Sequence, residues 1–410
     1  RVTFYLITPN ARLPRPEGAY AVLHFARSFN LPPDCPPPHW DWATWSRTSG
    51  LVGPQTELWA SWSDGPVGVD LARRLTRTRM SLPAFRSSAA HRAFQRSLLR
   101  LTLVVTARWL TGGWWAPLLF RDLVELAHCR AVAEHDLAES YFFPPQFMAR
   151  RPLWSWWTET RGRRTALVFY SHNFQVTFPP DRPEAVITDP IYSLTRWPET
   201  VYLTTSCGRI MEAAGAAPHR HVIGGAVAMV DSGVRMQVPK RPVVAIFDID
   251  PYPRSERALV GMPQPYHTHA VVRAFLEAAT AAVVAAGAVP VWKPKGALLP
   301  EHAVSATDLR YDRHVHLEIA RRHGVVLCPG GNPVHHLAQT TDAAIVLPFT
   351  TPATVFRLMG RPAAYFDPTG QLGRHALMAR GAPILTSPEE LRDWLRAVLD
   401  QADERMRVGA

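Results

Sequence analysis

Apolar residues in the C-terminal part of the chain fall into short runs that alternate with amphipathic stretches. The runs predict strands at 243–250, 288–295, 325–329, 343–349 and 363–367. Helical patterns separate them, including an Ala-rich stretch at 268–286 that Gly287 ends and a last helix from about Pro388 to Gln401 that Ser387 caps. Strands that alternate with helices in this way predict a parallel, doubly wound α/β domain.

The N-terminal part has a weaker pattern. β-branched and aromatic residues predict a first strand at 1–8, whereas 30–86 is rich in Pro, Trp and Ser, and no strand can be placed in it. Residues 89–140 are predicted to be mainly helical. Further strands are predicted at 166–171, 185–189, 200–205 and 221–225, with a helix at 207–214. This order again predicts a parallel α/β sheet.

The most apolar window, 101–120, lies inside the helical segment. Arg108 and the Gly112-Gly113 pair interrupt it, so it does not predict a transmembrane helix, which needs about 20 cleanly apolar residues. A buried helical hairpin that turns at the two glycines is the expected structure. The alternative is contact with a membrane surface. Its residues would be Trp109, Trp114 and Trp115, flanked by Arg100, Arg108 and Arg121.

A polar, Pro-bounded stretch at 231–242 is typical of an interdomain linker. The chain is therefore predicted to be an α/β protein of two Rossmann-like domains. The first, 1–235, would carry a helical insertion at about 88–140, and the second would span 241–400. Two such domains that face each other across a cleft form the GT-B architecture, an analogy of fold that does not establish an activity.

Charge and cysteine content narrow the range of possible protein classes, partners and compartments. The 45 basic residues exceed the 34 acidic ones by 11, but only three are lysines, so 45 − 3 = 42 are arginines. This bias is typical of coding composition, and since no nucleic-acid-binding motif accompanies it, we expect no nucleic-acid partner. The four cysteines form no CxxC pair, which argues against structural zinc or disulfides and fits the cytosol. The first ten residues lack the features of a signal peptide, so we expect a cytoplasmic protein.

The segment Leu347-Pro-Phe-Thr-Thr-Pro-Ala353 joins a predicted strand to a helix. Thr350 or Thr351 would be the N-cap, with Pro352 in the first turn and Pro348 just before. The free N–H groups and positive dipole end of such a helix suit a phosphate, and ligands of open α/β sheets bind beyond the carboxyl ends of strands. An ordinary capped helix is the alternative interpretation.

Two of the three lysines, Lys293 and Lys295, stand at another strand end. In a chain that uses arginine almost everywhere else, this pairing indicates a specific need for a mobile point charge, which suits a phosphate or a departing nucleotide. The alternative is a solvated loop tip.

Acidic residues also end strands. Asp248 and Asp250 follow the first strand of the second domain, where Pro251 prevents a Gly-rich phosphate turn, and Asp189 ends another strand. No GxGxxG or Walker motif is present, which excludes a Rossmann dehydrogenase or a P-loop ATPase. Glu159 follows a tryptophan-rich segment, and a carboxylate against tryptophans would have a raised pKa, as a general base or acid needs. Asp248 could instead be buried and bound to loop backbone.

The remaining polar residues give no metal pattern and no hydrolase motif. Paired histidines lack HExxH spacing or a cysteine partner, so no metal is expected. Asn173 and Asn332, two of only four asparagines, each follow a strand, where the amide could read a sugar hydroxyl or simply form a turn. No GxSxG elbow or Cys–His arrangement supports a hydrolase.

Several segments together resemble the bacterial PFTS-motif polysaccharide-biosynthesis proteins, a family of expected GT-B-type glycosyltransferases. The segments are RPLWSWWTETRG, LVFYSHN, VAIFDIDP with PYHTHAVVRAFL, WKPK and LPFTTPATVFRLMGRPAAYFDPTGQL, in family order between about 140 and 375. The naming motif has Thr351 in place of Ser, which keeps the hydroxyl. A more distant similarity to bacterial sialyl- and Kdo-transferases implies a CMP-sugar donor without a metal.

The resemblance implies an enzyme that moves a sugar from a nucleotide-activated donor to a surface polysaccharide or lipid-linked glycan. It would act at the cytoplasmic face of the inner membrane, with peripheral membrane contact. The donor phosphate would lie at Thr350 and Thr351, with Lys293 and Lys295 balancing the leaving charge. Glu159 would be the base or nucleophile, with Asp248 in reserve. Donor or acceptor sugar would meet Asn173, His172, Asp250, Tyr266 and Asn332.

Two other functions remain open at this point. Transfer of a polyol phosphate, as in teichoic-acid polymerases, would use His172 or His267 as acid or base. A glycan-binding scaffold that kept the fold without turnover is the other.

Overall fold

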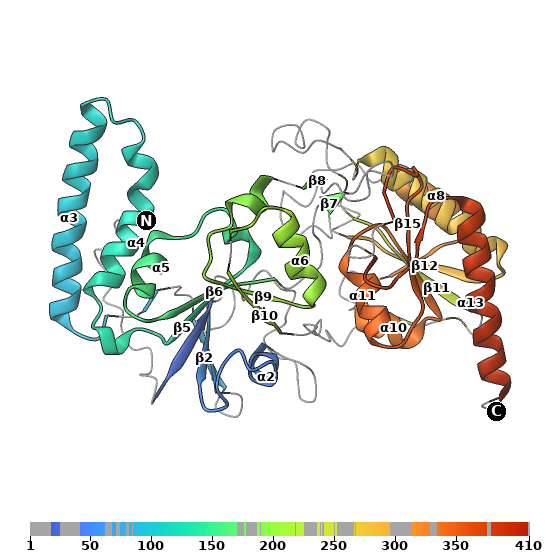
Figure 1. Cartoon of the computed structure of the whole chain (residues 1–410), viewed down its shortest axis with the longest axis horizontal. Helices are drawn as coiled ribbons and strands as arrows, with labels where there is room; N and C mark the ends of the chain where they lie inside the picture. Colours follow the sequence, from blue (N-terminus) through green and yellow to red (C-terminus); the bar gives the residue numbers. More distant parts are fainter. Residues whose placement is uncertain are drawn as a thin grey trace.

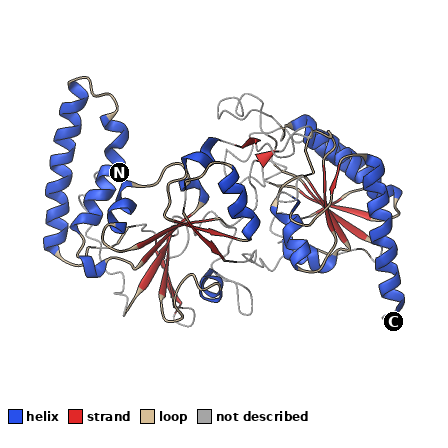
Figure 2. Ribbon diagram, in the orientation of Figure 1, coloured by secondary structure: helices blue, strands red, loops and turns tan. Residues whose placement is uncertain are grey.

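The structure is a computed structural model of the chain. It describes residues 18–24, 42–61, 68–70, 74–78, 82–83, 85–169, 176–177, 187–188, 190–217, 219–224, 236–237, 239, 242–249, 251, 266, 268–295, 314–328, 334–374 and 379–408. Two large sheets with flanking helices make up this part of the chain (Figures 1 and 2). The predicted first strand at 1–8 and most of the predicted linker lie outside the described residues.

The C-terminal sheet has six parallel strands in the order β13-β12-β11-β14-β15-β16. The strands are β11 (Val243–Phe247), β12 (Val289–Lys293), β13 (Val326–Leu327), β14 (Ala343–Val346), β15 (Ala363–Phe366) and β16 (Ile384–Leu385). The helices are α8 (His269–Ala285), α9 (His314–Arg322), α10 (Val334–Thr340), α11 (Thr351–Leu358) and α13 (Pro388–Val408). The order reverses between β11 and β14, as in a doubly wound sheet.

Alternation along the buried strands distributes side chains between two helical layers. In β11, Val244 and Ile246 join a hydrophobic cluster with α8, α9 and α13, whereas Ala245 and Phe247 join a second cluster with α10 and α11. Successive side chains of a strand point to opposite faces, so a strand covered on both sides must be apolar throughout, as β11 is.

The N-terminal sheet has eight strands in the order β10-β9-β6-β5-β1-β2-β4-β3, parallel except for the β3–β4 pair. The strands are β1 (Tyr20–Leu23), β2 (Glu57–Ser61), β3 (Gly68–Asp70), β4 (Leu75–Thr78), β5 (Ser140–Phe143), β6 (Arg164–Val168), β9 (Glu199–Tyr202) and β10 (Arg220–Ile223). The helices are α2 (Trp42–Thr48), α3 (Ser88–Leu110), α4 (Ala116–Ala131), α5 (Leu153–Glu159) and α6 (Thr205–Ala213), with short 3-10 turns at Glu134–Asp136, Pro145–Phe147 and Pro190–Leu194.

A hydrophobic cluster links the two α/β parts. It includes Cys207 and Met211 of α6 together with Phe356 of α11 and Tyr365 of β15. Figure 1 shows α6 on the side of the N-terminal sheet that faces α11. The predicted class, an α/β protein of GT-B-like layout with two doubly wound parts, is therefore confirmed.

Several details differ from the sequence-based expectations. Residues 30–86, in which no strand was placed, contain α2 and the strands β2, β3 and β4. Of the strand predicted at 185–189, the described residues are β8 (Ile187–Thr188), which pairs with β7 (Val176–Thr177) in a separate antiparallel ribbon. The last helix runs seven residues past its predicted end at Gln401, to Val408. Its predicted cap is present, since the Ser387 hydroxyl accepts from the Glu390 N–H at 3.2 Å.

Within the part of the chain that the structure describes, no helix is both long and apolar enough to span a bilayer.

Candidate functional site

The predicted phosphate-binding residues meet at the carboxyl edge of the C-terminal sheet. Three neighbouring strands end at this edge. Lys293 ends β12, Asp248 follows β11, and the segment Pro348–Thr351 follows β14. The position between β11 and β14 is the topological switch point, where helices leave the sheet on opposite faces and a crevice for ligands forms. Sequence spacing alone could not show this adjacency, because about 100 residues separate β11 from β14.

Asp248 connects two of these strand ends. Its side chain is 4% exposed, and Oδ1 accepts a hydrogen bond from the Lys295 backbone N–H at 2.7 Å. The carboxylate thus fixes the loop that follows β12, which is the alternative role considered for it above. It also leaves its negative charge beside the Lys293 ammonium group.

Lys293 is the last residue of β12, and its backbone pairs with Phe247 next to Asp248. Burial lowers the pKa of Lys293, while the nearby Cys328 and Asp248 act in the opposite direction. A half-buried ammonium group gains more from a bound anion than an exposed one does, because little water screens it. Lys295, two residues on, has an exposed side chain.

The segment Pro348–Thr351 ends β14 and begins α11. Thr350 is the N-cap, with φ −102° and ψ 160°, and its hydroxyl donates to the Leu347 carbonyl at 3.1 Å instead of capping the helix. Pro352 lies in the first turn, which contains no acidic residue. Because the side chains of Thr350 and Thr351 are buried, their contribution to an anion would come from the backbone N–H groups at the helix start. Pro348 is also buried and has no N–H to donate.

Phe349 adopts a backbone conformation that aromatic residues avoid, with φ +75°. Its ring is buried and packs edge-on against Tyr365 with 5.6 Å between centroids, and the Tyr365 hydroxyl donates to the Thr350 carbonyl at 3.2 Å. A left-handed conformation costs an L-residue about 1–2 kcal/mol. The surrounding contacts therefore hold the turn before α11 in one strained shape, as occurs often at ligand sites.

Asp367 was not among the predicted site residues. It follows β15 at the same edge and is completely buried. Its carboxylate accepts hydrogen bonds from Tyr266 Oη at 2.7 Å, from Thr369 N and Oγ1 at 2.9 and 2.7 Å, and from Leu372 N at 2.8 Å. Tyr266, predicted to meet a sugar, is thus buried and engaged with Asp367. An aspartate directly after an apolar strand and before Pro-Thr-Gly was the available signal.

Glu159 lies in the N-terminal part of the chain, at the end of helix α5, and not at the edge that holds these residues. It ends α5, shortly before Arg164 begins β6, so it stands at the amino edge rather than the carboxyl edge. Its carboxylate forms an ion pair with Arg151, which also donates to Thr165 Oγ1 at 2.9 Å. The tryptophan expected against Glu159 instead contacts the arginine, whose guanidinium lies 4.0 Å from the Trp156 ring.

His24 is a second residue that sequence reasoning missed. It follows β1 at the carboxyl edge, next to β5, where the strand order of the N-terminal sheet reverses. Its ring stacks on Phe143 at 4.4 Å, and burial lowers the pKa of His24 to about 3. Among the described residues, the buried Nε2 atom has no hydrogen-bond partner. The histidine directly after the apolar run Tyr20–Leu23 was the signal.

Four predicted sugar-contacting residues, His172, Asn173, Asp250 and Asn332, lie outside the described residues, as do Asp189 and His267. Among the residues that are described, no group of three His, Cys, Asp or Glu side chains could hold a metal ion.

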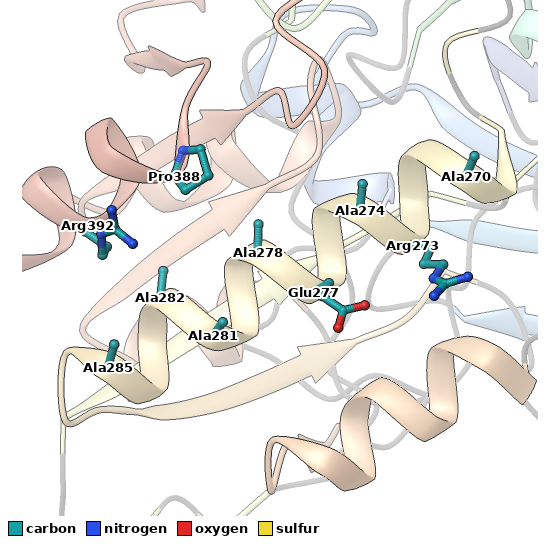
Figure 3. Close-up of a pocket in the computed structure, with 10 residues that line it drawn as sticks. All are labelled: Ala270, Arg273, Ala274, Glu277, Ala278, Ala281, Ala282, Ala285, Pro388 and Arg392. Carbon is teal, nitrogen blue, oxygen red and sulfur yellow. The ribbon is translucent and has the colours of Figure 1, made fainter.

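A groove between α8 and α13 lies on the outer layer of the C-terminal sheet (Figure 3). Figure 3 shows alanines along one face of α8, with Arg273 and Glu277 beside them and Pro388 and Arg392 opposite. None of the predicted site residues lines it. Its alanine surface offers few polar groups, so the strand edge remains the candidate site.

Two doubly wound sheets, one of which carries a lysine, a helix N-terminus and a strained turn at its switch point, define a GT-B-like α/β protein. The profile of the family described as "Polysaccharide biosynthesis PFTS motif protein" matches residues 101–395. The chain belongs to this family. The resemblance seen in the sequence is therefore confirmed. No curated protein sequence matches the chain significantly.

Solved structures that resemble the chain include the following three. An α,α-trehalose-phosphate synthase (UDP-forming) from Burkholderia vietnamiensis is 12% identical over 93% of this chain and 91% of its own, with a TM-score of 0.43. The spinosyn rhamnosyltransferase SpnG with spinosyn aglycone is 13% identical over 93% and 92%, with a TM-score of 0.38. UGT2 from Phytolacca americana is 10% identical over 95% and 94%, with a TM-score of 0.39. At such low scores, the fold assignment rests on the strand order instead.

Proposed function

We propose that this member of the PFTS polysaccharide-biosynthesis family is a glycosyltransferase whose nucleotide-sugar donor binds at the carboxyl edge of the C-terminal sheet. The observation that carries the proposal is the convergence of Lys293, Asp248 and the start of α11 on adjacent strand ends at the switch point. A half-buried cation beside uncharged N–H donors suits the phosphate of a nucleotide.

The reaction breaks the bond between the sugar's anomeric carbon and the donor phosphate oxygen, and forms a bond from that carbon to an acceptor hydroxyl oxygen. The acceptor hydroxyl releases its proton as the new bond forms. Negative charge grows on the departing phosphate as its bond to carbon breaks. Lys293 and the N–H groups at the start of α11 would stabilise that charge, with the exposed Lys295 assisting. In this arrangement they would do the work that a divalent cation does elsewhere, so we propose a metal-independent enzyme. The acceptor, a surface polysaccharide or lipid-linked glycan, would bind on the N-terminal side.

A CMP-activated sugar, such as Kdo or a sialic acid, is the first donor to test. A thermal-shift series with CMP, CDP, UDP, GDP and dTDP identifies the nucleotide, because a ligand that binds only the folded state raises the melting temperature of the protein. The matching nucleotide sugar is then incubated with a lipid-linked acceptor, and the product mass is measured. Gain of one glycosyl unit supports the proposal, whereas nucleotide binding without transfer or donor hydrolysis would indicate a scaffold.

The same mass measurement separates sugar transfer from polyol-phosphate transfer, since only the latter adds phosphorus to the acceptor. The histidines that the latter reaction would use lie outside the described residues, so no observation favours it.

A further inference from the structure

The helical hairpin formed by α3 and α4 projects away from the sheets (Figure 1). We call residues 99–121 the hairpin tip. Near its base, Phe94 and Leu98 of α3 pack against Val124 of α4, and these are the buried apolar residues between the two helices. With 23 residues, α3 is about 35 Å long, so the tip stands well clear of the sheet.

The hairpin tip is covered with exposed apolar side chains, which corrects the expectation of a buried hairpin. Trp114 is 71% exposed, Leu110 75% and Leu118 66%. The full set is Leu99, Leu103, Val104, Trp109, Leu110, Trp114, Trp115, Leu118 and Leu119. Ala116 is the only residue of the tip that is buried. Exposed apolar side chains concentrated on one segment in this way mark a site of contact with a partner or a membrane.

The charges on the tip have one sign. Residues 88–121, all of them described, include no Asp or Glu, whereas Arg100, Arg108 and Arg121 are exposed around the apolar side chains. The first acids beyond the tip are engaged, Asp122 by Arg150 at 3.1 Å and Glu125 by Arg121 at 2.9 Å. Because Arg121 is paired with Glu125, the tip combines its apolar area with the positive charges of Arg100 and Arg108.

We propose that the hairpin tip inserts into the interfacial region of an anionic lipid bilayer and holds the protein on that surface. Tryptophan is the residue that favours the membrane–water interface, and three exposed tryptophans surround the turn at Gly112. Arginines around the apolar patch attract anionic headgroups. The two helices are not long and apolar enough to span a bilayer, so the contact is interfacial.

Charge favours a bilayer over a second copy of the chain. A symmetric dimer through the tip would place the same arginines, Arg100 and Arg108, of two copies near each other without an acidic partner on this surface. An anionic membrane supplies the missing negative charge. The inference is independent of the donor or reaction proposed above.

Co-sedimentation of the full chain with lipid vesicles tests the proposal. We expect binding to phosphatidylcholine vesicles that contain about one-third phosphatidylglycerol, and at least about tenfold weaker binding to pure phosphatidylcholine. The double variant Trp114→Ser/Trp115→Ser should lower the membrane partition coefficient about tenfold or more. Vesicles should shift the tryptophan fluorescence of the wild type to shorter wavelength, and this shift should be lost in the variant. Its melting temperature should stay at the wild-type value, because both side chains are exposed in the native state.

Matched controls remove exposed apolar or charged side chains outside the hairpin tip. Leu194→Ser/Leu358→Ser removes two exposed apolar side chains outside the hairpin, and Arg392→Gln/Arg396→Gln removes two exposed charges from α13. Both controls should bind vesicles like wild type, whereas Arg100→Gln/Arg108→Gln should bind about tenfold more weakly. Absence of vesicle binding by the wild type overturns the proposal. Vesicle binding by the tryptophan variant that equals wild-type binding overturns it too. A third contrary result is a wild-type protein that forms a dimer and does not bind vesicles, with the tryptophan variant a monomer.

Discussion

At the scale of single residues, a few buried charged or titratable side chains decide local structure. Asp248 holds the Lys295 N–H across 47 residues of sequence, and Asp367 organises the turn after β15 in the same way. Each stands directly after an apolar strand, where a carboxylate can accept backbone N–H groups that the sheet leaves unpaired. Glu159 has a different task, because its partner is a nearly buried arginine.

Glu159→Gln separates a structural role from the predicted catalytic one. Burial lowers the pKa of Arg151, and the Glu159 carboxylate opposes that effect, so loss of the carboxylate charge should weaken folding. Because Glu159 is 39% exposed, we expect a loss of only about 1–2 kcal/mol in the free energy of unfolding. Glu277→Gln, in an exposed ion pair with Arg322 in the middle of α8, is the control and should change little.

Chemical denaturation and a transfer assay read out the two roles of Glu159. A rate of transfer that stays near the wild-type value supports the structural role. An intact fold with transfer abolished would instead establish Glu159 as the base.

His128, at the base of the hairpin, should make stability depend on pH. Burial lowers the pKa of His128 to about 4 from 6.5, although its Nε2 atom lies 2.7 Å from the Pro83 carbonyl. Between these values the unfolded chain binds more protons than the folded one, so stability is complete above about pH 6.5 and falls as the pH drops towards 4. The shift corresponds to roughly 3 kcal/mol.

His128→Gln should flatten this part of the profile, measured as melting temperature from pH 7.5 to 4.5 in steps of about half a unit. His24, with its lowered pKa, should leave a residual slope of the same sign. The exposed His135→Gln serves as the control. A slope in His128→Gln that equals the wild-type slope would refute the assignment.

At the scale of elements, the connection from β15 to β16 depends on Asp367. Asp367→Asn keeps the size of the side chain but replaces one acceptor oxygen by an NH2 group. The remaining oxygen can accept either from Leu372 N or from Tyr266 and Thr369, but not from both sets of donors. We expect a loss of about 2–3 kcal/mol in unfolding free energy. The exposed Asp393→Asn should be neutral by the same denaturation measurement, and similar stability of both variants would count against this role.

The sequence predicted elements that are buried on both faces better than any others. β11, β14 and β15 are uninterrupted apolar runs, and β12 is apolar up to Lys293. Gly287 follows α8 and Ser387 precedes α13, as the sequence predicts. β2, β3 and β4 were missed because they are three to five residues long and lie among Pro, Trp and Ser. Their pairing is also set by distant strands, since β1 and β2 are parallel.

For the site, the sequence identified residues at strand ends but not which strands are neighbours in the sheet. Lys293, Asp248 and Thr350 were recognised from scarcity and position, and the fold places their strands side by side. The ion pair of Glu159 could not be read from sequence, because Arg151 becomes buried only when α5 packs on the sheet. Exposure of the hairpin tip depends likewise on which elements pack against α3 and α4.

At the scale of the whole molecule, each described region has a different proposed role. The C-terminal sheet presents the proposed donor site, the N-terminal sheet would receive the acceptor, and the hairpin tip would hold a membrane surface. In Figure 1 the hairpin lies at the end of the molecule opposite α13. A lipid-linked acceptor would reach the N-terminal side from that membrane.

The central claim is that a nucleotide phosphate binds beside Lys293 and the start of α11. Titration calorimetry of the nucleotide chosen by the thermal-shift series, on wild type and on Lys293→Met, tests it most directly. We predict affinity about tenfold or more weaker in Lys293→Met. Affinity should stay near wild type in Thr351→Ala, which keeps the backbone N–H, and in the surface control Arg396→Met. Equal affinity in Lys293→Met and wild type, or no nucleotide binding by the wild type, would contradict the account.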